Sequence, residues 1–152
     1  MADLFDGKRN LVLGAEYNTD YQTLQKAHLE LNDSFFLAVM IGYRNQQKIP
    51  SNIRRGLEFN SLAFSPVQKE LLYGLILSWK NMDLQTMVDN ESINQIYEKL
   101  IAYANGGLQW LRGNIFPDYL DADGAIVADP STILLKLNEM IAEEVSSNKA
   151  PF

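Results

Sequence analysis

Apolar residues recur every three or four positions over most of this 152-residue chain, the spacing that places them on one face of a helix. The densest run, Phe35 to Tyr43, is apolar around the whole helical circumference, which is typical of a helix surrounded by others. The polar residues that begin at Arg44, and then Pro50, end this run. The pattern therefore predicts a central core helix that Asp33 caps at its N-terminus.

Four more amphipathic stretches predict helices around this core helix. Each begins at a residue suited to an N-cap, namely Asp20, Ser65, Asn90 and Asp129. Proline follows directly in two of them, and Ser65 to Gln68 has the residues of a capping box. The expected buried faces are Tyr21, Leu24, Ala27 and Leu31; Val67, Leu71, Leu72, Leu75 and Ile76, with Trp79 near the end; Ile93, Ile96, Tyr97, Leu100, Ile101 and Ala104; and Ile133, Leu134, Leu137, Ile141 and Val145.

Two short apolar pieces suit an extended chain better than a helix. One is Leu11 to Leu13, and the other lies around Leu57-Glu58-Phe59, inside a long connection that spans residues 44–65. No internal repeat or interdomain linker divides the chain. We therefore predict a mainly α-helical protein, a compact single-domain bundle of about five or six helices over residues 1–152, with room for a minor extended element.

A pair of glycines, Gly106 and Gly107, interrupts the apolar stripe that begins at Ile93. Two glycines cost about 2 kcal/mol of helix propensity relative to alanine. The pair either ends the helix or lets another backbone approach closely. Both interpretations make the two glycines structural, and we expect their joint replacement by valine to lower stability by about 1 kcal/mol or more.

The composition narrows the classes of protein. Hydrophobic residues make up 47% of the chain, which favours a folded domain over disorder. The absence of cysteine removes disulfides, thiolate zinc sites and cysteine nucleophiles. Acids stand near the N-terminus where a signal peptide needs basic residues, and no apolar run approaches the roughly 20 residues of a membrane span. We therefore expect a cytoplasmic protein without a membrane partner.

No motif in the chain predicts a catalytic, cofactor or metal site. Asp121 to Gly124 resembles the middle of a calcium loop, but that alignment places a tyrosine and a proline at the two main carboxylate positions. The single histidine, His28, is expected to be a surface or boundary residue. Glu143 and Glu144 are adjacent on a helix and point about 100° apart, so they do not converge on one substrate atom. We therefore expect a protein that is not an enzyme, and a small hydrolase or nuclease is the least favoured class.

One stretch stands out against the net charge of −6. Residues 44–55 contain Arg44, Lys48, Arg54 and Arg55 and no acidic residue. Such a basic loop can contact an acidic partner or nucleic-acid phosphates. The alternative is a solvated connection whose arginines pair with this protein's own carboxylates.

Two segments together resemble a known family. They are Phe35 to Tyr43 with the polar residues that follow, and Tyr103-Ala104-Asn105-Gly106-Gly107-Leu108. They resemble the small Dnd-associated accessory proteins encoded beside bacterial DNA phosphorothioation and restriction genes. The resemblance implies a cytoplasmic accessory of a phage-defence system and supplies no catalytic residue.

The leading functional hypothesis is therefore a non-enzymatic accessory or adaptor protein of a bacterial DNA-modification, restriction or anti-phage system. Its expected partners are other protein subunits of such a complex, with nucleic acid contacted only through the basic loop. The alternative is an immunity or antitoxin-like protein whose acidic surface neutralises a basic effector, which the net charge of −6 would suit.

Overall fold

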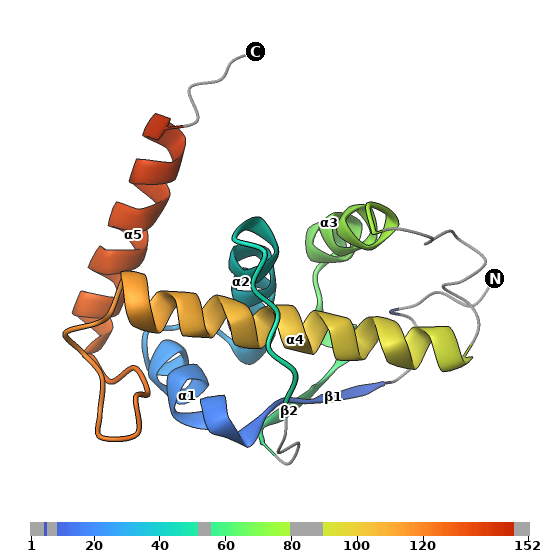
Figure 1. Ribbon diagram of the computed structural model, residues 1–152, viewed down its shortest axis with the longest axis horizontal. Coiled ribbons are helices and arrows are strands. Elements are labelled where there is room, and N and C mark those ends of the chain that lie inside the picture. The colour runs from blue at the N-terminus through green and yellow to red at the C-terminus, as the bar shows by residue number, and fades with distance from the viewer. Residues whose placement is uncertain (1–4, 6–8, 52–55, 80–89, 148–152) are drawn as a thin grey trace.

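The computed structural model describes residue 5 and residues 9–51, 56–79 and 90–147, and these residues form a mainly helical single domain, as predicted (Figure 1). In chain order the elements are β1 (Asn10–Val12), η1 (Ala15–Tyr17), α1 (Asn18–Lys26), α2 (Leu31–Arg44), β2 (Glu58–Asn60), η2 (Ser61–Ala63), α3 (Pro66–Leu77), α4 (Asn90–Asn114) and α5 (Pro130–Ser147). None of the described helices is long and apolar enough to cross a membrane.

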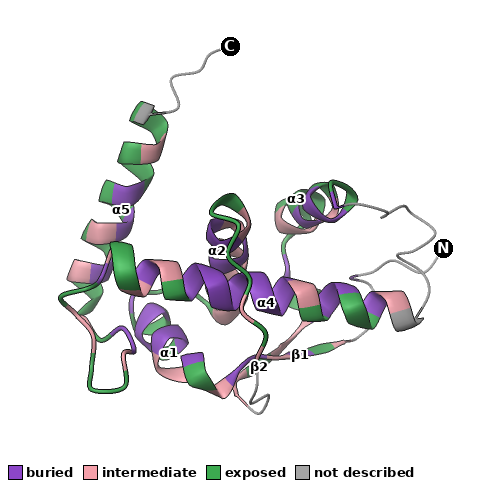
Figure 2. Cartoon of the chain, viewed as in Figure 1, coloured by how far each residue is buried: buried purple, intermediate pink, exposed green. Residues whose placement is uncertain are grey.

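The crossing of α2 and α4 forms the centre of the fold. These two helices pack against each other more extensively than any other pair of described elements. The middle of α4 is buried on every side, as the purple ribbon of Figure 2 shows, and α2 buries Phe35, Ala38 and Val39. The expected core helix is therefore confirmed, and the apolar stripe of α4 from Ile93 to Ala104 is buried as predicted.

The start of α3 follows the predicted capping box. The Ser65 Oγ accepts a hydrogen bond from the backbone N–H of Gln68 at 3.1 Å, and the Gln68 Oε1 accepts one from the Ser65 N–H at 2.9 Å. The predicted buried face of α3 is wrong at two positions, because Val67 is 63% exposed and Leu71 is 52% exposed. The body of the protein covers only the side of α3 that carries Leu72 and Ile76.

The boundary between α1 and α2 differs from the prediction. The expected first helix ran on to Leu31, but α1 ends at Lys26, and Leu31 is the first residue of α2. His28 lies between the two helices with a φ of 69°, a left-handed conformation that stops a helix. Asp33 lies in the first turn of α2 rather than at its N-cap.

The two extended pieces pair as a small antiparallel sheet. Leu11 of β1 lies opposite Phe59 of β2, and Asn10 lies opposite Asn60. This sheet lies beside α4, on the side away from α3 in Figure 1. The long connection after α2 therefore returns to the N-terminal segment before α3 begins.

Helix α5 projects from the body of the protein (Figure 1). Its predicted N-terminus is confirmed, because the Asp129 Oδ1 accepts a hydrogen bond from the Thr132 N–H at 2.8 Å and Pro130 is the first helical residue. Its predicted buried face is right at two of five positions. Ile133 and Leu137 are buried together with Met140, whereas Leu134, Ile141 and Val145 are exposed.

Candidate functional site

The structure places half of the predicted basic loop. Arg44 is the last residue of α2, and its Nη2 lies 2.5 Å from the Oε2 of Glu144 in α5. Lys48 is exposed four residues later. Arg54 and Arg55 lie outside the described residues. For Arg44, the observed partner is one of this protein's own carboxylates, as the alternative interpretation of the loop predicted.

The loop after α2 runs along α4. The backbone N–H of Ile49 donates to the Ala102 carbonyl at 3.0 Å, and the Nδ2 of Asn105 donates to the Ile49 carbonyl at 2.8 Å and to the Ser51 Oγ at 2.6 Å. Asn105 is buried, so these bonds provide partners for an amide that would be costly to bury alone. The loop from Asn45 to Ser51 is therefore held on α4 and carries Lys48 with it.

The paired glycines lie where this loop and α2 meet α4. A Cβ on Gly107 would lie 1.9 Å from the Ala38 carbonyl oxygen, and one on Gly106 would lie 1.9 Å from the Gln47 carbonyl oxygen. On the α2 side, a Cβ on Gly42 would lie 1.9 Å from the Tyr103 carbonyl oxygen. Helix α4 continues through the pair, so the glycines serve a close backbone approach and do not end the helix.

A cluster of rings and lysines, the cation–aromatic cluster, lies beside this crossing. It consists of Tyr43 from α2, Lys48 from the loop, Trp79 after α3, and Lys99 and Tyr103 from α4. The Tyr103 ring meets the Tyr43 ring edge-on at 5.5 Å and stacks on the Trp79 ring at 5.9 Å between centroids. The Nζ of Lys99 lies 4.3 Å from the centroid of Trp79, and the Nζ of Lys48 lies 5.7 Å from that of Tyr103.

The two lysines of the cluster influence each other. Partial burial, and secondarily the charge of Lys48, lower the pKa of Lys99. Neither ammonium group forms an ion pair with a described residue. A surface hollow of about 500 Å³ lies at this place, lined by Tyr43, Arg44, Gln46, Lys48 and Tyr103.

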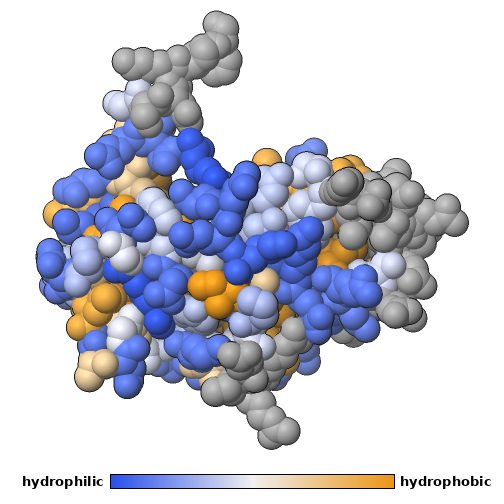
Figure 3. Space-filling model, in the orientation of Figure 1, coloured by the Kyte–Doolittle hydropathy of each residue, from blue (hydrophilic) through white to orange (hydrophobic). Residues whose placement is uncertain are grey.

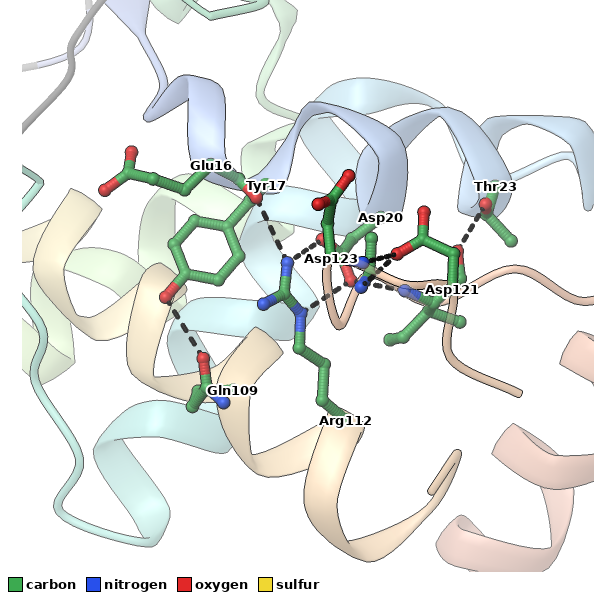
Figure 4. A network of polar contacts seen from close by, with 10 residues as sticks. Glu16, Tyr17, Asp20, Thr23, Gln109, Arg112, Asp121 and Asp123 are labelled. Atoms are coloured by element: carbon green, nitrogen blue, oxygen red, sulfur yellow. Dashed lines mark hydrogen bonds and ion pairs between the residues drawn. The ribbon is translucent and has the colours of Figure 1, made fainter. Parts of the chain in front are cut away.

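A second polar centre lies on the other side of α4, around the buried Asp20 (Figure 4). Its carboxylate accepts two hydrogen bonds from Arg112, at 2.6 and 3.0 Å, and a third from the Ile126 N–H at 2.9 Å. The Arg112 guanidinium also donates to the Glu16 carbonyl and lies 4.7 Å from the centroid of the Tyr17 ring.

This second centre is structural. Every one of these donors and acceptors belongs to the protein, and the bonds join α1, the end of α4 and the connection to α5. Burial acts to lower the pKa of Arg112, but the hydrogen bonds and charge of Asp20 outweigh it and raise that pKa. Arg112 therefore stays positively charged opposite the Asp20 carboxylate. The prediction that Asp20 caps the first helix is wrong, because it lies within the first turn of α1.

In the acidic turn after α4, a carboxylate oxygen accepts hydrogen bonds from the backbone of the turn itself. The Asp121 Oδ1 accepts hydrogen bonds from the N–H groups of Asp123 and Ala125, both at 2.9 Å, and Gly124 has a φ of 83°. Within the described part of the chain, no group of three or more His, Cys, Asp and Glu residues is placed to hold a metal ion. His28 is exposed, in line with its expected surface or boundary position.

The projecting helix α5 carries the third feature, an exposed apolar stripe that consists of Leu134, Ile141 and Val145. Their spacings of seven and four place them on one helix face. They are 42%, 51% and 71% exposed, so exposure increases toward the end of the helix. In Figure 3, orange hydrophobic residues appear among blue hydrophilic ones on the side of the molecule where α5 lies.

Comparison of the chain with protein-family models, curated proteins and solved structures finds no match. The geometry therefore carries the functional argument by itself. Lys99 and the three rings of the cluster belong to no sequence motif that predicts a site. The spacing of Lys99 and Tyr103 by four residues is a signal that the two share a face of α4, but nothing in the sequence brings Trp79 to them.

Proposed function

We propose that this chain is a non-enzymatic accessory or adaptor protein that acts by protein–protein contacts and that α5 is its docking element. The observation that supports this function is the exposed apolar stripe of α5. A large aliphatic side chain gains about 1.5–3 kcal/mol on full burial. Leu134, Ile141 and Val145 are between 42% and 71% exposed, so burial against a partner would still release much of this free energy.

The position of the stripe on α5 also supports docking. The buried residues Ile133, Leu137 and Met140 lie on the adjoining face of α5, so the apolar surface of the helix is wider than the body can cover. The helix also projects from the body, as Figure 2 shows with its green exposed residues. A projecting helix with an uncovered apolar stripe has the form of an element that fits into a groove on another protein.

The charge of α5 indicates a basic partner. The helix contains three glutamates, Glu139, Glu143 and Glu144, and one lysine, Lys136, and Glu144 is already paired with Arg44. A helix is about 10 Å thick, close to the Debye length of about 8 Å at physiological salt, so the glutamates influence a partner on either side of it. Two copies of this acidic helix would repel each other. The favoured partner is another protein with an apolar groove and basic residues at its rim.

The setting in a bacterial DNA-modification, restriction or phage-defence system remains a prediction that rests on the sequence resemblance. The acidic helix also favours the second candidate, an immunity or antitoxin-like protein that neutralises a basic effector. Neighbouring genes distinguish the two settings. Modification or restriction genes support the first, and a toxin gene supports the second.

Affinity capture tests the docking helix. The tagged full chain and two double variants are expressed in the source organism, and captured proteins are quantified by mass spectrometry. Ile141→Ser with Val145→Ser removes the end of the stripe, and Val67→Ser with Leu71→Ser on α3 is the matched control, since its two aliphatic residues are also exposed.

We expect the α5 variant to lose a specific partner while its circular dichroism spectrum stays unchanged, and the α3 variant to keep that partner. Binding of the purified partner to the wild-type chain then confirms direct contact. Retention of all partners by the α5 variant contradicts the proposal. Conversion of a wild-type dimer to a monomer by the α5 variant also contradicts it, because the groove would then belong to a second copy of this chain.

A further inference from the structure

The cation–aromatic cluster is a concentration of positive charge that no described carboxylate neutralises. Lys48 and Lys99 come from the loop and from α4, and neither has an ion-pair partner among the described residues. Like charges brought together without a carboxylate between them cost free energy. This cost is notable in a chain with a net charge of −6, where acidic residues outnumber basic ones.

The ring contacts hold the ammonium groups in place. Lys99 lies over the Trp79 ring and Lys48 lies over the Tyr103 ring, and the two rings stack on each other. A lysine over an aromatic face gains about 0.5–1 kcal/mol at an exposed site. The side of its ammonium group that faces away from the ring stays accessible to a ligand. The backbone bonds of the loop to α4 fix the position of Lys48 further.

We propose that the cation–aromatic cluster binds the phosphates of a nucleic-acid backbone without reading its sequence. Lysine is a compact point charge that accepts a phosphate from many directions, whereas the arginine fork is suited to carboxylates as well as phosphates. The arginine at the edge of the hollow, Arg44, already holds the carboxylate of Glu144. Within the described part of the cluster, Lys48 and Lys99 have no carboxylate partner, and two point charges of this kind suit the oxygen atoms of a phosphate backbone.

Burial of the rings determines the mode of binding. Trp79 is 6% exposed and Tyr103 is 8% exposed, and each has its face occupied by the other ring or by a lysine. Bases therefore cannot stack on them as they do on the open aromatic platforms of single-strand binding proteins. The strand lies in the hollow beside Tyr43 and Gln46, where Lys48 contacts its backbone, and Lys99 adds its charge from over the Trp79 ring. Binding of this kind is weak and strongly dependent on salt.

Fluorescence anisotropy with labelled DNA tests the proposal. Two unrelated sequences are used, each as a single strand and as a duplex. Each probe is titrated with the full chain at several low salt concentrations. We expect equal affinity for the two sequences and, for the duplex, a slope of log K against log salt of about −2, the value for two phosphates neutralised.

The decisive variant is Lys48→Glu with Lys99→Glu. Its matched control is Lys26→Glu with Lys136→Glu, which changes the net charge equally on α1 and α5. We expect the cluster variant to lose at least about ten-fold in affinity and the control to lose less than about three-fold, because only the cluster lysines place their charge beside the phosphates. Lys99→Gln alone keeps most of the side chain over Trp79, so it separates loss of charge from loss of packing if the double variant melts early.

Three results would overturn the proposal. They are no binding by the wild-type chain at low salt, equal losses in the cluster and control variants, and competition by inorganic phosphate or by polyglutamate as effective as competition by DNA. The last result would assign the cluster to a small anion or an acidic protein. The α5 variant Ile141→Ser with Val145→Ser should bind DNA as the wild type does. The DNA-binding proposal and the docking proposal can therefore be refuted separately.

Discussion

The glycine contact at the crossing of α2 and α4 leads to a sharp prediction for Gly107→Ala. The added Cβ would lie 1.9 Å from the Ala38 carbonyl oxygen and 2.7 Å from its carbonyl carbon. Both atoms belong to the backbone of α2, so no side-chain rotation relieves the overlap. The helices would have to separate by more than about 1 Å to restore an ordinary contact of roughly 3.5 Å. The same helix offers the control, because a Cβ on Gly113 meets nothing within 4 Å.

The two substitutions should therefore have opposite signs. Overpacking a well-packed core costs about 1–3 kcal/mol. Alanine in place of glycine inside a helix returns about 0.5–1 kcal/mol through backbone entropy. We expect Gly107→Ala to destabilise the protein by about 1–2 kcal/mol and Gly113→Ala to stabilise it by about 0.5–1 kcal/mol. The joint replacement of Gly106 and Gly107 by valine should cost more than either alanine.

Urea denaturation followed by circular dichroism measures both free energies of unfolding. A thermal scan should separate the two variants by several degrees, since 1 kcal/mol shifts the melting temperature of a domain of this size by about 2–4 °C. If Gly107→Ala is as stable as Gly113→Ala, the close approach of α2 to α4 is not present in solution. The two helices would then pack at an ordinary distance, and Gly107 would have no structural role at the crossing.

Three further predictions concern the polar groups. Asp20→Ala should lower stability by about 3–5 kcal/mol in urea denaturation, because it leaves the Arg112 charge buried without its partner, and a loss below about 1 kcal/mol would contradict this. Hydrogen bonds from the Thr132 backbone lower the pKa of Asp129, so its stabilising effect is complete above the unfolded pKa of about 4 and disappears as the pH falls through the folded value. Asp129→Ala should therefore lower the melting temperature more at pH 7 than at pH 2, whereas an equal loss at both values would exclude a role for the carboxylate charge. Calcium at micromolar concentration should not shift the thermal transition, because the Asp121 Oδ1 already accepts two backbone N–H groups, and a shift of several degrees would show a site that this geometry does not explain.

Local signals account for the parts of the fold that could be predicted. The capping box at Ser65 and the Asp129 cap depend on residues within one helical turn, and both form as expected. The α4 stripe from Ile93 to Ala104 is buried because a helix across the centre of the protein meets neighbours on every side. Periodicity is reliable there, since no face of the helix is left to solvent.

The same reasoning fails where burial depends on the extent of the neighbouring surface. The α5 stripe has the right period, but the body covers only the face that carries Ile133, Leu137 and Met140, so Ile141 and Val145 stay exposed. At Leu31 the period continued across a chain reversal, because one left-handed residue, His28, changes direction without altering the pattern of apolar positions. A periodic pattern predicts which face is apolar and leaves open what covers it.

The candidate sites depend on contacts that no local pattern contains. Asp20 meets Arg112 across 92 positions, and the sequence has many other acidic and basic residues that could pair. The basic loop drew attention because its charges are consecutive in the sequence. Lys99 was missed because it joins Lys48 only through the packing of α2, α3 and α4. Charge that is clustered in space need not be clustered along the chain.

The glycine contact and the cation–aromatic cluster are two consequences of one packing arrangement. Gly42 lies against the Tyr103 carbonyl, and the next residue, Tyr43, places its ring 5.5 Å from the Tyr103 ring. Any larger residue at Gly42 would push α2 off α4 and separate these rings. Helix axes usually lie 8–10 Å apart, and small residues at the crossing allow the closer approach that lets the two tyrosines meet. The position of Lys48 over Tyr103 is therefore set by glycines in the helices as much as by the sequence of the loop that carries it.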